Sequence, residues 1–410
     1  MTDAALAETL ADARPDDLAR GTSRSGGRIY NERLALSLIR RHGSMPKAEI
    51  ARRTGLSAQT VSIIVRQLVR DGLLLKEKPR RGSIGQPPVP VSLNPDGAFF
   101  VGIKIGRRSA DIMLVDLVGR VRAKVHEIFP YPMPAHILAL VRSGFDRVTA
   151  SLRPEQRKRL AGIGVATPYE LWNWASEMGA PHEALAEWRV FDLKRELSSA
   201  FGLPVHVCND ASAACAAELT FGRGDRFRDF AYFFIGTFIG GGVVLNGSLF
   251  QGRTGNAGAL GSMPVSAGEP GGGQLINSAS LYTLEHKLVS LGRDPSVLWQ
   301  NTEDWGDIGA PLEAWIAEAA AALATAILSA VAVIDFEAVI IDGAMPANVL
   351  GRLIDRVRAD LSRMDQQGLS SFVVEAGAIG AAARALGGAS LPLIANFATD
   401  RDILFKDHAA

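Results

Sequence analysis

Hydrophobic residues near the amino terminus recur at helical spacing in successive short segments. The first segment covers residues 31–42, opens at Asn31, a residue type that caps helices, and is stopped by Gly43. The second covers residues 45–54 and ends at Gly55. Because only a few residues separate the segments, we expect two helices joined by a tight connection.

A third segment, residues 57–70, has a clear apolar face. Ser57 is a good amino-terminal cap, and Asp71-Gly72 ends the segment. The apolar residues that fall on one face are Val61, Ile64, Val65 and Leu68. Three helices in this order predict a helix-turn-helix, in which the third helix lies in the major groove of DNA.

The first residues of this third helix have side chains that can read DNA. Gln59 can pair with adenine, the Ala58 methyl group can meet a thymine methyl, and serine or threonine hydroxyls can contact bases or phosphates. The residues of this helix that we expect to contact DNA are Ser57, Ala58, Gln59, Thr60, Ser62 and Arg66.

A hairpin is predicted after the third helix. Two apolar stretches, residues 73–75 and 89–93, flank a basic loop rich in glycine and proline. Such a loop is typical of a wing, so Arg80 and Arg81 are expected to contact phosphates or enter the minor groove, with Gln86 on the same loop. The sequence therefore predicts a winged helix-turn-helix domain over residues 28–95.

The charge distribution agrees with a DNA-binding module. The whole chain has a net charge of +1, but residues 28–90 hold thirteen Lys and Arg against four acidic residues, a net charge of +9. A small cationic segment joined to an acidic body indicates one part that meets a polyanion and one that does not. The alternative is a helical packing module with a merely solvated basic face. The cap, the turn glycine and the basic loop together favour double-stranded DNA as the partner.

After Pro95 the pattern changes to short apolar strands, glycine-rich turns and helices. The predicted strands cover residues 99–105, 110–115, 120–129, 160–166, 204–207, 230–235, 241–245, 338–341 and 372–375. The predicted helices cover residues 135–151, 192–201, 210–221, 312–333, 348–364 and 378–386. Strand groups followed by crossover helices occur twice, which indicates two α/β lobes around a cleft.

Three further features bear on the location of the protein. The longest uncharged run, residues 319–334, is short for a membrane span and predicts a buried helix. Residues 1–27 are polar without a secretion signal, and we expect a disordered arm. Cys208 and Cys215 are too few for a disulfide framework or a four-thiolate zinc site. These features favour a soluble, cytoplasmic protein with no membrane partner.

The body contains short motifs in a characteristic order. They are Asn209-Asp210-Ala211 with Glu218, Gly236-Thr237 ahead of Gly240-Gly241-Gly242, Asn256-Ala257-Gly258, and the late run of residues 377–382. Together with the helix-turn-helix, they resemble the ROK family of repressors and sugar kinases over about residues 28–388. The resemblance implies an actin-like ATPase fold, of the ribonuclease H-like class, over residues 96–388, with a sugar site between the lobes. It also implies a homodimer or tetramer. Residues 389–410 are expected to form a tail.

Asn209 and Asp210 stand between a predicted strand and a helix, where open α/β sheets bind ligands. The resemblance implies that the matching Asp of the kinases takes a proton from a sugar hydroxyl and that the matching Asn holds the sugar. The alternative is that both residues only cap the helix. The residues that we expect to bind a ligand are Asn209, Asp210, Thr167, Pro168, Glu170 and Trp172.

An aromatic stretch follows Pro168, where the family usually continues with glycine. Aromatic faces beside polar groups suit a ligand that has both C–H faces and hydroxyls. Trp172, Trp174 and Trp188 fit a packed insertion equally well, because large aromatic residues are often buried. Both interpretations stay open.

The chain departs from the kinase pattern of the family at several positions. Lys104 stands in place of an acidic residue linked to magnesium, and Phe238 replaces a glycine of the second phosphate loop. Ala259 and Ile276 replace two sugar-binding Glu residues. The zinc ligands are replaced by Ser262, Ala267, Glu269 and Gln274, and the adenosine-side Gly-Gly-Gly reads Asp342-Gly343-Ala344. We therefore expect no enzyme activity, no cofactor and no metal, with Asp210 a vestige of the catalytic base.

The sequence favours a DNA-binding transcription regulator, expected to be a repressor, whose degenerate kinase-like body senses a sugar or polyol. A ligand that favours one closure of the lobes would change half-site spacing and thereby operator affinity. Two alternatives stay open. One is an active sugar kinase with an accessory DNA-binding module, and the other is a regulator controlled by a protein partner without a small ligand.

Overall fold

The structure, a computed structural model, describes residues 24–79, 88–168, 171–174, 180, 185–266 and 273–399. It divides into two compact units. The first contains the described residues up to Gly97 together with those from Ile394 on, and the second runs from Ala98 to Leu393. Most of the predicted arm, up to position 23, lies outside the described residues, as does the predicted tail from position 400.

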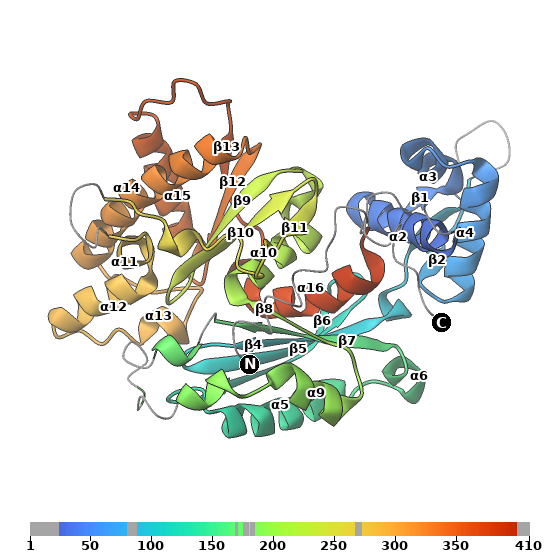
Figure 1. The fold of residues 1–410 in the computed structure, drawn as a ribbon, viewed down its shortest axis with the longest axis horizontal. Helices are drawn as coiled ribbons and strands as arrows, with labels where there is room; N and C mark the ends of the chain where they lie inside the picture. Colours follow the sequence, from blue (N-terminus) through green and yellow to red (C-terminus); the bar gives the residue numbers. More distant parts are fainter. Residues whose placement is uncertain are drawn as a thin grey trace, which may run out of the picture. The chain divides into compact units, whose positions relative to one another are not determined.

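The first unit is a helix-turn-helix followed by a β-hairpin (Figure 1). Its elements are α2 (Arg24–His42), β1 (Met45–Pro46), α3 (Lys47–Thr54), α4 (Ala58–Arg70), β2 (Leu74–Lys76), β3 (Pro90–Leu93) and the 3-10 turn η2 (Pro95–Gly97). The strands form an antiparallel sheet in the order β1-β3-β2. The predicted sequence of three helices and a hairpin is confirmed.

Two boundaries in this unit differ from the prediction. Helix α2 begins at Arg24, so Asn31 lies inside the helix and does not cap it. Met45 belongs to β1 and not to the second helix, because it pairs with Val91 and is buried there. The pairing with a strand far along the chain overrides the local helical pattern.

The second unit begins with a lobe built on a five-stranded sheet. Its elements are β4 (Phe99–Ile105), β5 (Ser109–Asp116), β6 (Val121–Ile128), α5 (Pro134–Thr149), α6 (Pro154–Arg157), β7 (Leu160–Thr167), η3 (Leu171–Trp174), η4 (Glu187–Arg189), α9 (Leu193–Phe201) and β8 (Val205–Asn209). The strand order is β6-β5-β4-β7-β8, with β4, β7 and β8 parallel. All seven residues of β4 are buried, because helices α5 and α9 cover one face of the sheet and a later helix, α16, covers the other (Figure 1).

The second lobe repeats this arrangement. Its elements are α10 (Asp210–Phe221), η5 (Arg223–Asp225), β9 (Phe230–Ile235), β10 (Ile239–Leu245), β11 (Ser248–Phe250), η6 (Leu260–Ser262), α11 (Ile276–Ala279), α12 (Leu281–Ser290), α13 (Val297–Gln300), α14 (Ala310–Val333), β12 (Ala338–Gly343), α15 (Ala347–Leu361) and β13 (Val373–Ala376). The strand order β11-β10-β9-β12-β13 has the same topology as the first sheet. Two lobes of repeated α/β topology were predicted, and they are confirmed.

Helix α16 (Ala383–Phe397) follows the short turn η7 (Gly380–Ala382) and packs against the first lobe through glycines. A Cβ atom on Gly164 of β7 would lie 1.8 Å from the carbonyl oxygen of Gly388, and one on Gly387 would lie 1.9 Å from that of Ala213. The predicted helix over residues 378–386 is wrong at both ends. The glycines that suggested its end permit close backbone packing instead.

Helix α14 contains the long uncharged run of the sequence. It is long and apolar enough to cross a membrane, but 56% of its most apolar 18-residue window is buried inside the protein. Trp315, Leu323 and Ile327 are fully buried in the core of the second lobe. The prediction of a buried helix is confirmed.

Candidate functional site

Helix α4 of the first unit has one buried face and one open face. Ser57 caps the helix, with its Oγ accepting a hydrogen bond from the backbone N–H of Thr60 at 3.1 Å. The buried residues are Val61, Ile64, Val65 and Leu68, as predicted. Among the residues expected to contact DNA, Ala58, Gln59 and Arg66 are exposed. The apolar face holds the helix to its unit and leaves the opposite face for a partner.

Two of the predicted side chains are engaged within the unit. Thr60 Oγ1 lies 2.8 Å from Ser57 Oγ, which completes the cap. Ser62 is half-buried and its Oγ accepts a hydrogen bond from Lys47 of α3 at 3.5 Å. A DNA partner would meet these hydroxyls with part of their hydrogen-bonding capacity already used.

The sequence prediction overlooked two outward residues of α4. Ile63 is 52% exposed, and Arg70 is exposed at the carboxyl end of the helix. Together with Gln59 and Arg66 they form one stripe at helical spacing, opposite the buried face. That spacing was present in the sequence and could have identified both. Ile63, Arg66, Val69, Arg70 and Lys76 line a hollow of about 420 Å³ between α4 and the hairpin.

The predicted wing residues Arg80, Arg81 and Gln86 lie outside the described residues. The strands that carry the loop are described. Lys76 of β2 is paired with Val91 of β3, and the N–H of Glu77 donates to the carbonyl of Pro90 at 2.9 Å. The loop therefore starts from an antiparallel ladder, as a wing requires.

In the second unit, three parallel strands bring the predicted ligand-binding residues to one edge of the first lobe. Lys104 pairs with Ala166 across β4 and β7, and Thr167 pairs with Asn209 across β7 and β8. Thr167, Pro168, Asn209 and Asp210 therefore follow neighbouring strands at their carboxyl ends, the usual location of ligands in such sheets. Glu170 lies outside the described residues.

Asn209 and Asp210 have different partners at this edge. Asn209 Oδ1 accepts hydrogen bonds from the N–H groups of Ala211 at 3.0 Å and Ser212 at 3.4 Å, so Asn209 caps α10. Asp210 Oδ2 lies 3.2 Å from Nη1 of Arg384 on α16, and both side chains are less than a fifth exposed. The Arg384 guanidinium also lies over the Phe234 ring, 5.1 Å from its centroid. A fixed internal cation thus neutralises Asp210.

Lys104 is a second buried cation at the same edge. Its Nζ donates to Ser109 Oγ at 2.9 Å and lies 3.6 Å from Asp111 Oδ2. Burial lowers the pKa of Lys104 to about 8; the Arg384 guanidinium adds to this effect, and the Asp111 and Asp210 carboxylates oppose it. The side chain folds back over Gly106, where a Cβ atom would lie 2.6 Å from Nζ. Lys104 therefore fills the turn after β4.

The turn between β9 and β10 is bonded to the start of α12. The carbonyl oxygens of Gly236 and Thr237 accept hydrogen bonds from the N–H groups of Leu281 and Tyr282, both at 3.0 Å. The N–H of Ile239 donates to Ser280 Oγ at 3.0 Å. These contacts use both the backbone N–H groups at the start of α12 and a backbone N–H of the turn, which a phosphate would otherwise need.

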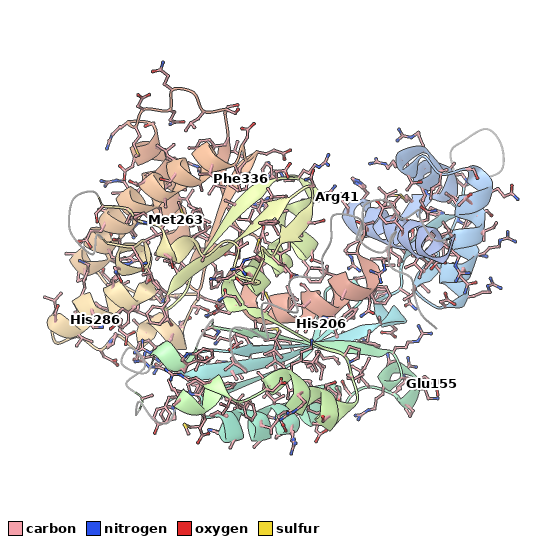
Figure 2. The ribbon with its side chains drawn as sticks, in the orientation of Figure 1. Arg41, Glu155, His206, Met263, His286 and Phe336 are labelled. Atoms are coloured by element: carbon pink, nitrogen blue, oxygen red, sulfur yellow. The ribbon has the colours of Figure 1, made fainter. Side chains whose placement is uncertain are left out.

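Aromatic rings cover the same turn. The Phe238 ring lies 5.4 Å from that of Tyr282, which in turn lies 4.2 Å from the ring of His286, labelled in Figure 2. Arg107 lies over the other side of this cluster, 5.6 Å from the Tyr282 centroid. The turn is therefore packed by side chains of the protein itself.

An ion-pair cluster joins the β4–β5 turn of the first lobe to α12 of the second. Glu285 accepts hydrogen bonds from Arg107 Nη1 at 3.2 Å and from Arg108 Nη2 at 3.0 Å. The Glu285 and Arg107 side chains are only 12% and 10% exposed. Arg108 also lies over the Trp299 ring at 4.4 Å. We call these residues the lobe clasp, because they connect the two lobes.

Two buried carboxyls stabilise the backbone on the far side of the second lobe. Asp342 accepts hydrogen bonds from Tyr232 OH at 3.1 Å and from the N–H groups of Gly343 and Gly380. Glu218 accepts from the N–H groups of Arg223 and Ala378. Burial raises the pKa of both carboxyls. Their partners are backbone and tyrosine groups, which indicates a structural role.

The tryptophans of the aromatic stretch pack toward the first lobe. Trp188 is buried and its Nε1 donates to the carbonyl of Pro132 at 2.7 Å. Trp172 is half-buried and also packs against the core of this lobe. Within the part of the chain that the structure describes, no three His, Cys, Asp or Glu side chains gather in a way that could hold a metal.

Comparison with known proteins gives matches for both units. Residues 100–274 match the ROK family, and residues 30–74 match a winged helix-turn-helix DNA-binding family. The uncharacterized protein y4fQ of Sinorhizobium fredii is 27% identical over 90% of this chain and 92% of its own length. The xylose repressor of Bacillus spizizenii is 27% identical over 58% of this chain and 62% of its own length.

A solved structure has the same fold. A ROK family transcriptional regulator, a homolog of the Escherichia coli MLC protein, covers 93% of this chain and 98% of its own with a TM-score of 0.65 and 21% identity.

Proposed function

Since this chain belongs to the ROK family and carries an amino-terminal winged helix-turn-helix, we propose that it is a DNA-binding transcription regulator, acting as a repressor in the cytoplasm. The observation that carries the proposal is the open face of α4, where Gln59 and Arg66 are exposed on a helix whose opposite face is buried. The proteins similar to it include xylose repressors. A homodimer would present two such helices to a two-fold symmetric operator.

The proposal assigns no kinase chemistry to the second unit. Phosphoryl transfer depends on a metal-linked carboxylate and on backbone groups that can approach phosphates. Here Lys104 lies where the family resemblance calls for an acidic residue, and Arg384 neutralises Asp210. The turn around Phe238 is bonded to α12. These contacts support a body that has kept the fold of a sugar kinase without its reaction.

We assign to this body the sensing of a sugar or polyol at the carboxyl ends of β7 and β8. Thr167, Pro168, Asn209 and Asp210 follow these strands, and Glu170 and Trp172 belong to the next segment of the chain. The relatives include proteins named as xylose and N-acetylglucosamine repressors. Binding that differs between two closures of the lobes would change operator affinity by the same free-energy difference.

Selection of bound duplexes from a random pool tests the DNA-binding proposal. The full chain should recover a palindromic site, and Arg66→Ala should weaken binding and reduce the salt dependence by about one phosphate contact. Arg363→Ala is the control, because this residue is exposed in the second unit and pairs with Asp360 of the same unit. Recovery of no preferred sequence by the wild-type chain contradicts the proposal.

Thermal shift against a panel of sugars and polyols tests the sensing role. A ligand at a hundredfold its dissociation constant should stabilise the chain by about 2.7 kcal/mol. The Asp210→Asn variant should lose this shift, whereas Asp360→Asn should keep it. No shift with any member would favour control by a protein partner, and release of ADP with ATP and a sugar would favour the active kinase.

A further inference from the structure

Ile63 is a large apolar side chain at the centre of the open face of α4. At 100° per residue, Gln59, Ile63, Arg66 and Arg70 lie opposite the buried face. The Ile63 side chain is 52% exposed, although its neighbours Ile64 and Val65 are fully packed. A single exposed isoleucine is common on protein surfaces, so its surroundings decide whether it has a role.

The surroundings of Ile63 are cationic. Arg66, Arg70 and Lys76 line the hollow of about 420 Å³ beside it, and the remaining lining residue is the aliphatic Val69. The only carboxylate near this end of the helix, Asp71, accepts a hydrogen bond from Gln67 at 2.8 Å. A partner for this surface must bring negative charge to the cations and an apolar group to Ile63.

DNA has this combination of groups. Its phosphates supply the negative charge, and the C5-methyl group of thymine is the apolar group exposed in the major groove. We propose that Ile63 reads a thymine methyl group and that Arg66, Arg70 and Lys76 bind the phosphates that flank it. This inference rests on the proposed DNA-binding function, and it names a specificity-determining residue within that function.

The geometry relates Ile63 to Gln59. The two residues are one turn apart on the helix, about 6 Å along its axis, which corresponds to about two base pairs. Gln59 can pair with adenine through two hydrogen bonds. The half-site should therefore contain an adenine and a thymine close together, on the part of the major groove that α4 enters.

The experiment uses the full chain and the duplex recovered by selection from random sequences. Each thymine of one half-site is replaced in turn by deoxyuridine, which removes only the methyl group. For the wild-type chain, one replacement should weaken binding by roughly fourfold, the effect of losing one apolar methyl contact. With Ile63→Ala the same replacement should have no effect, while the other thymines behave as before.

Leu75→Ala is the matched control. Leu75 is also an exposed aliphatic residue, 45% exposed, but it alternates with Lys76 on β2 and so faces away from the hollow. This variant should keep the full response to deoxyuridine. Circular dichroism should show unchanged folding for both variants, because both side chains are exposed.

The outcomes separate this inference from the proposed function. Equal binding of thymine and deoxyuridine duplexes by the wild-type chain, or an unchanged deoxyuridine response in Ile63→Ala, overturns the role of Ile63 and leaves DNA binding intact. If the wild-type chain binds no duplex sequence preferentially, the proposed function fails and the role of Ile63 fails with it.

Discussion

The guanidinium of Arg384 on α16 lies 3.2 Å from the carboxylate of Asp210 at the start of α10, and both side chains are largely buried. Few contacts in the second unit join residues so distant in the sequence and so close to the predicted ligand site. The pair ties the helix that covers the first sheet to the helix that opens the second lobe. It also fixes the charge of Asp210, whether or not a ligand is bound.

Removal of one member of this pair should destabilise the second unit. In Asp210→Ala, Arg384 would be left as an uncompensated, mostly buried charge, at a cost of about 2 kcal/mol, below the 3–5 kcal/mol of fully buried pairs. The double variant Asp210→Ala with Arg384→Ala should lose less than the sum of the single variants. Urea unfolding of the four proteins measures this coupling. Strict additivity would show that the pair contributes nothing.

The buried Lys104 should make stability depend on pH in the alkaline range. Its pKa is about 8 in the folded chain and near 10.5 when exposed, so the folded state releases its proton first. Below pH 8 both states are charged and burial is unfavourable. As pH rises from 8 to 10.5, that cost disappears, up to roughly 3 kcal/mol. Wild-type stability relative to Lys104→Met should therefore increase over this window.

The control for this prediction is Lys124→Met. Lys124 pairs with the same carboxylate, Asp111, at 3.3 Å, but its side chain is 48% exposed. Melting curves of the three proteins at several pH values provide the comparison. Parallel curves for wild type and Lys104→Met from pH 8 to 10.5 would contradict the burial argument, whereas Lys124→Met should follow the wild type.

Loss of the lobe clasp should loosen the connection between the lobes. Glu285→Gln removes the carboxylate that Arg107 and Arg108 share. Amide hydrogen exchange should then accelerate in the β4–β5 turn and in α12 by roughly tenfold, which corresponds to about 1.4 kcal/mol. Glu318→Gln is the control, because that carboxylate pairs with Lys287 of α12 at an exposed position. Unchanged exchange in Glu285→Gln would show that the aromatic contacts alone hold the turn.

Ser57 combines a structural role with a predicted DNA contact, and two substitutions separate them. Ser57→Ala removes the cap of α4 and should destabilise this helix by about 1 kcal/mol. Ser57→Asp can still cap the helix but adds a negative charge near phosphate. Hydrogen exchange over α4 should therefore be faster only in Ser57→Ala, while DNA binding should fall in both. Normal binding by Ser57→Asp would remove Ser57 from the interface.

The sequence predicted the strands and long helices of the chain better than its short helices. Strands such as β4 and β9 are continuous apolar runs, and their burial on both faces follows directly from that pattern. Helices α11 and α13 have only four residues each, too few to show a period. Helix α2 includes Gly26 and Gly27, whose low helix propensity hid its true start.

The candidate site could be predicted only where it depends on local order. Asn209 and Asp210 follow a strand and begin a helix, so the edge where they lie was correctly predicted. Their partners could not be predicted, because Arg384 is 174 residues away from Asp210 and no local pattern links the two. Ile63 was overlooked for a different reason, since an apolar residue on a helix suggests burial until its angular position is compared with its neighbours.

Lys104 also limits how this protein can evolve. A chain with aspartate at position 104 would bring a third carboxylate to the edge that already holds Asp111 and Asp210, and it would remove one of their cations. Like charges in a buried setting repel strongly, so this single step would lower stability before any metal or nucleotide could be gained. A return to catalysis would require several coordinated substitutions. The internal cations therefore work as a ratchet that keeps the lineage in its present role.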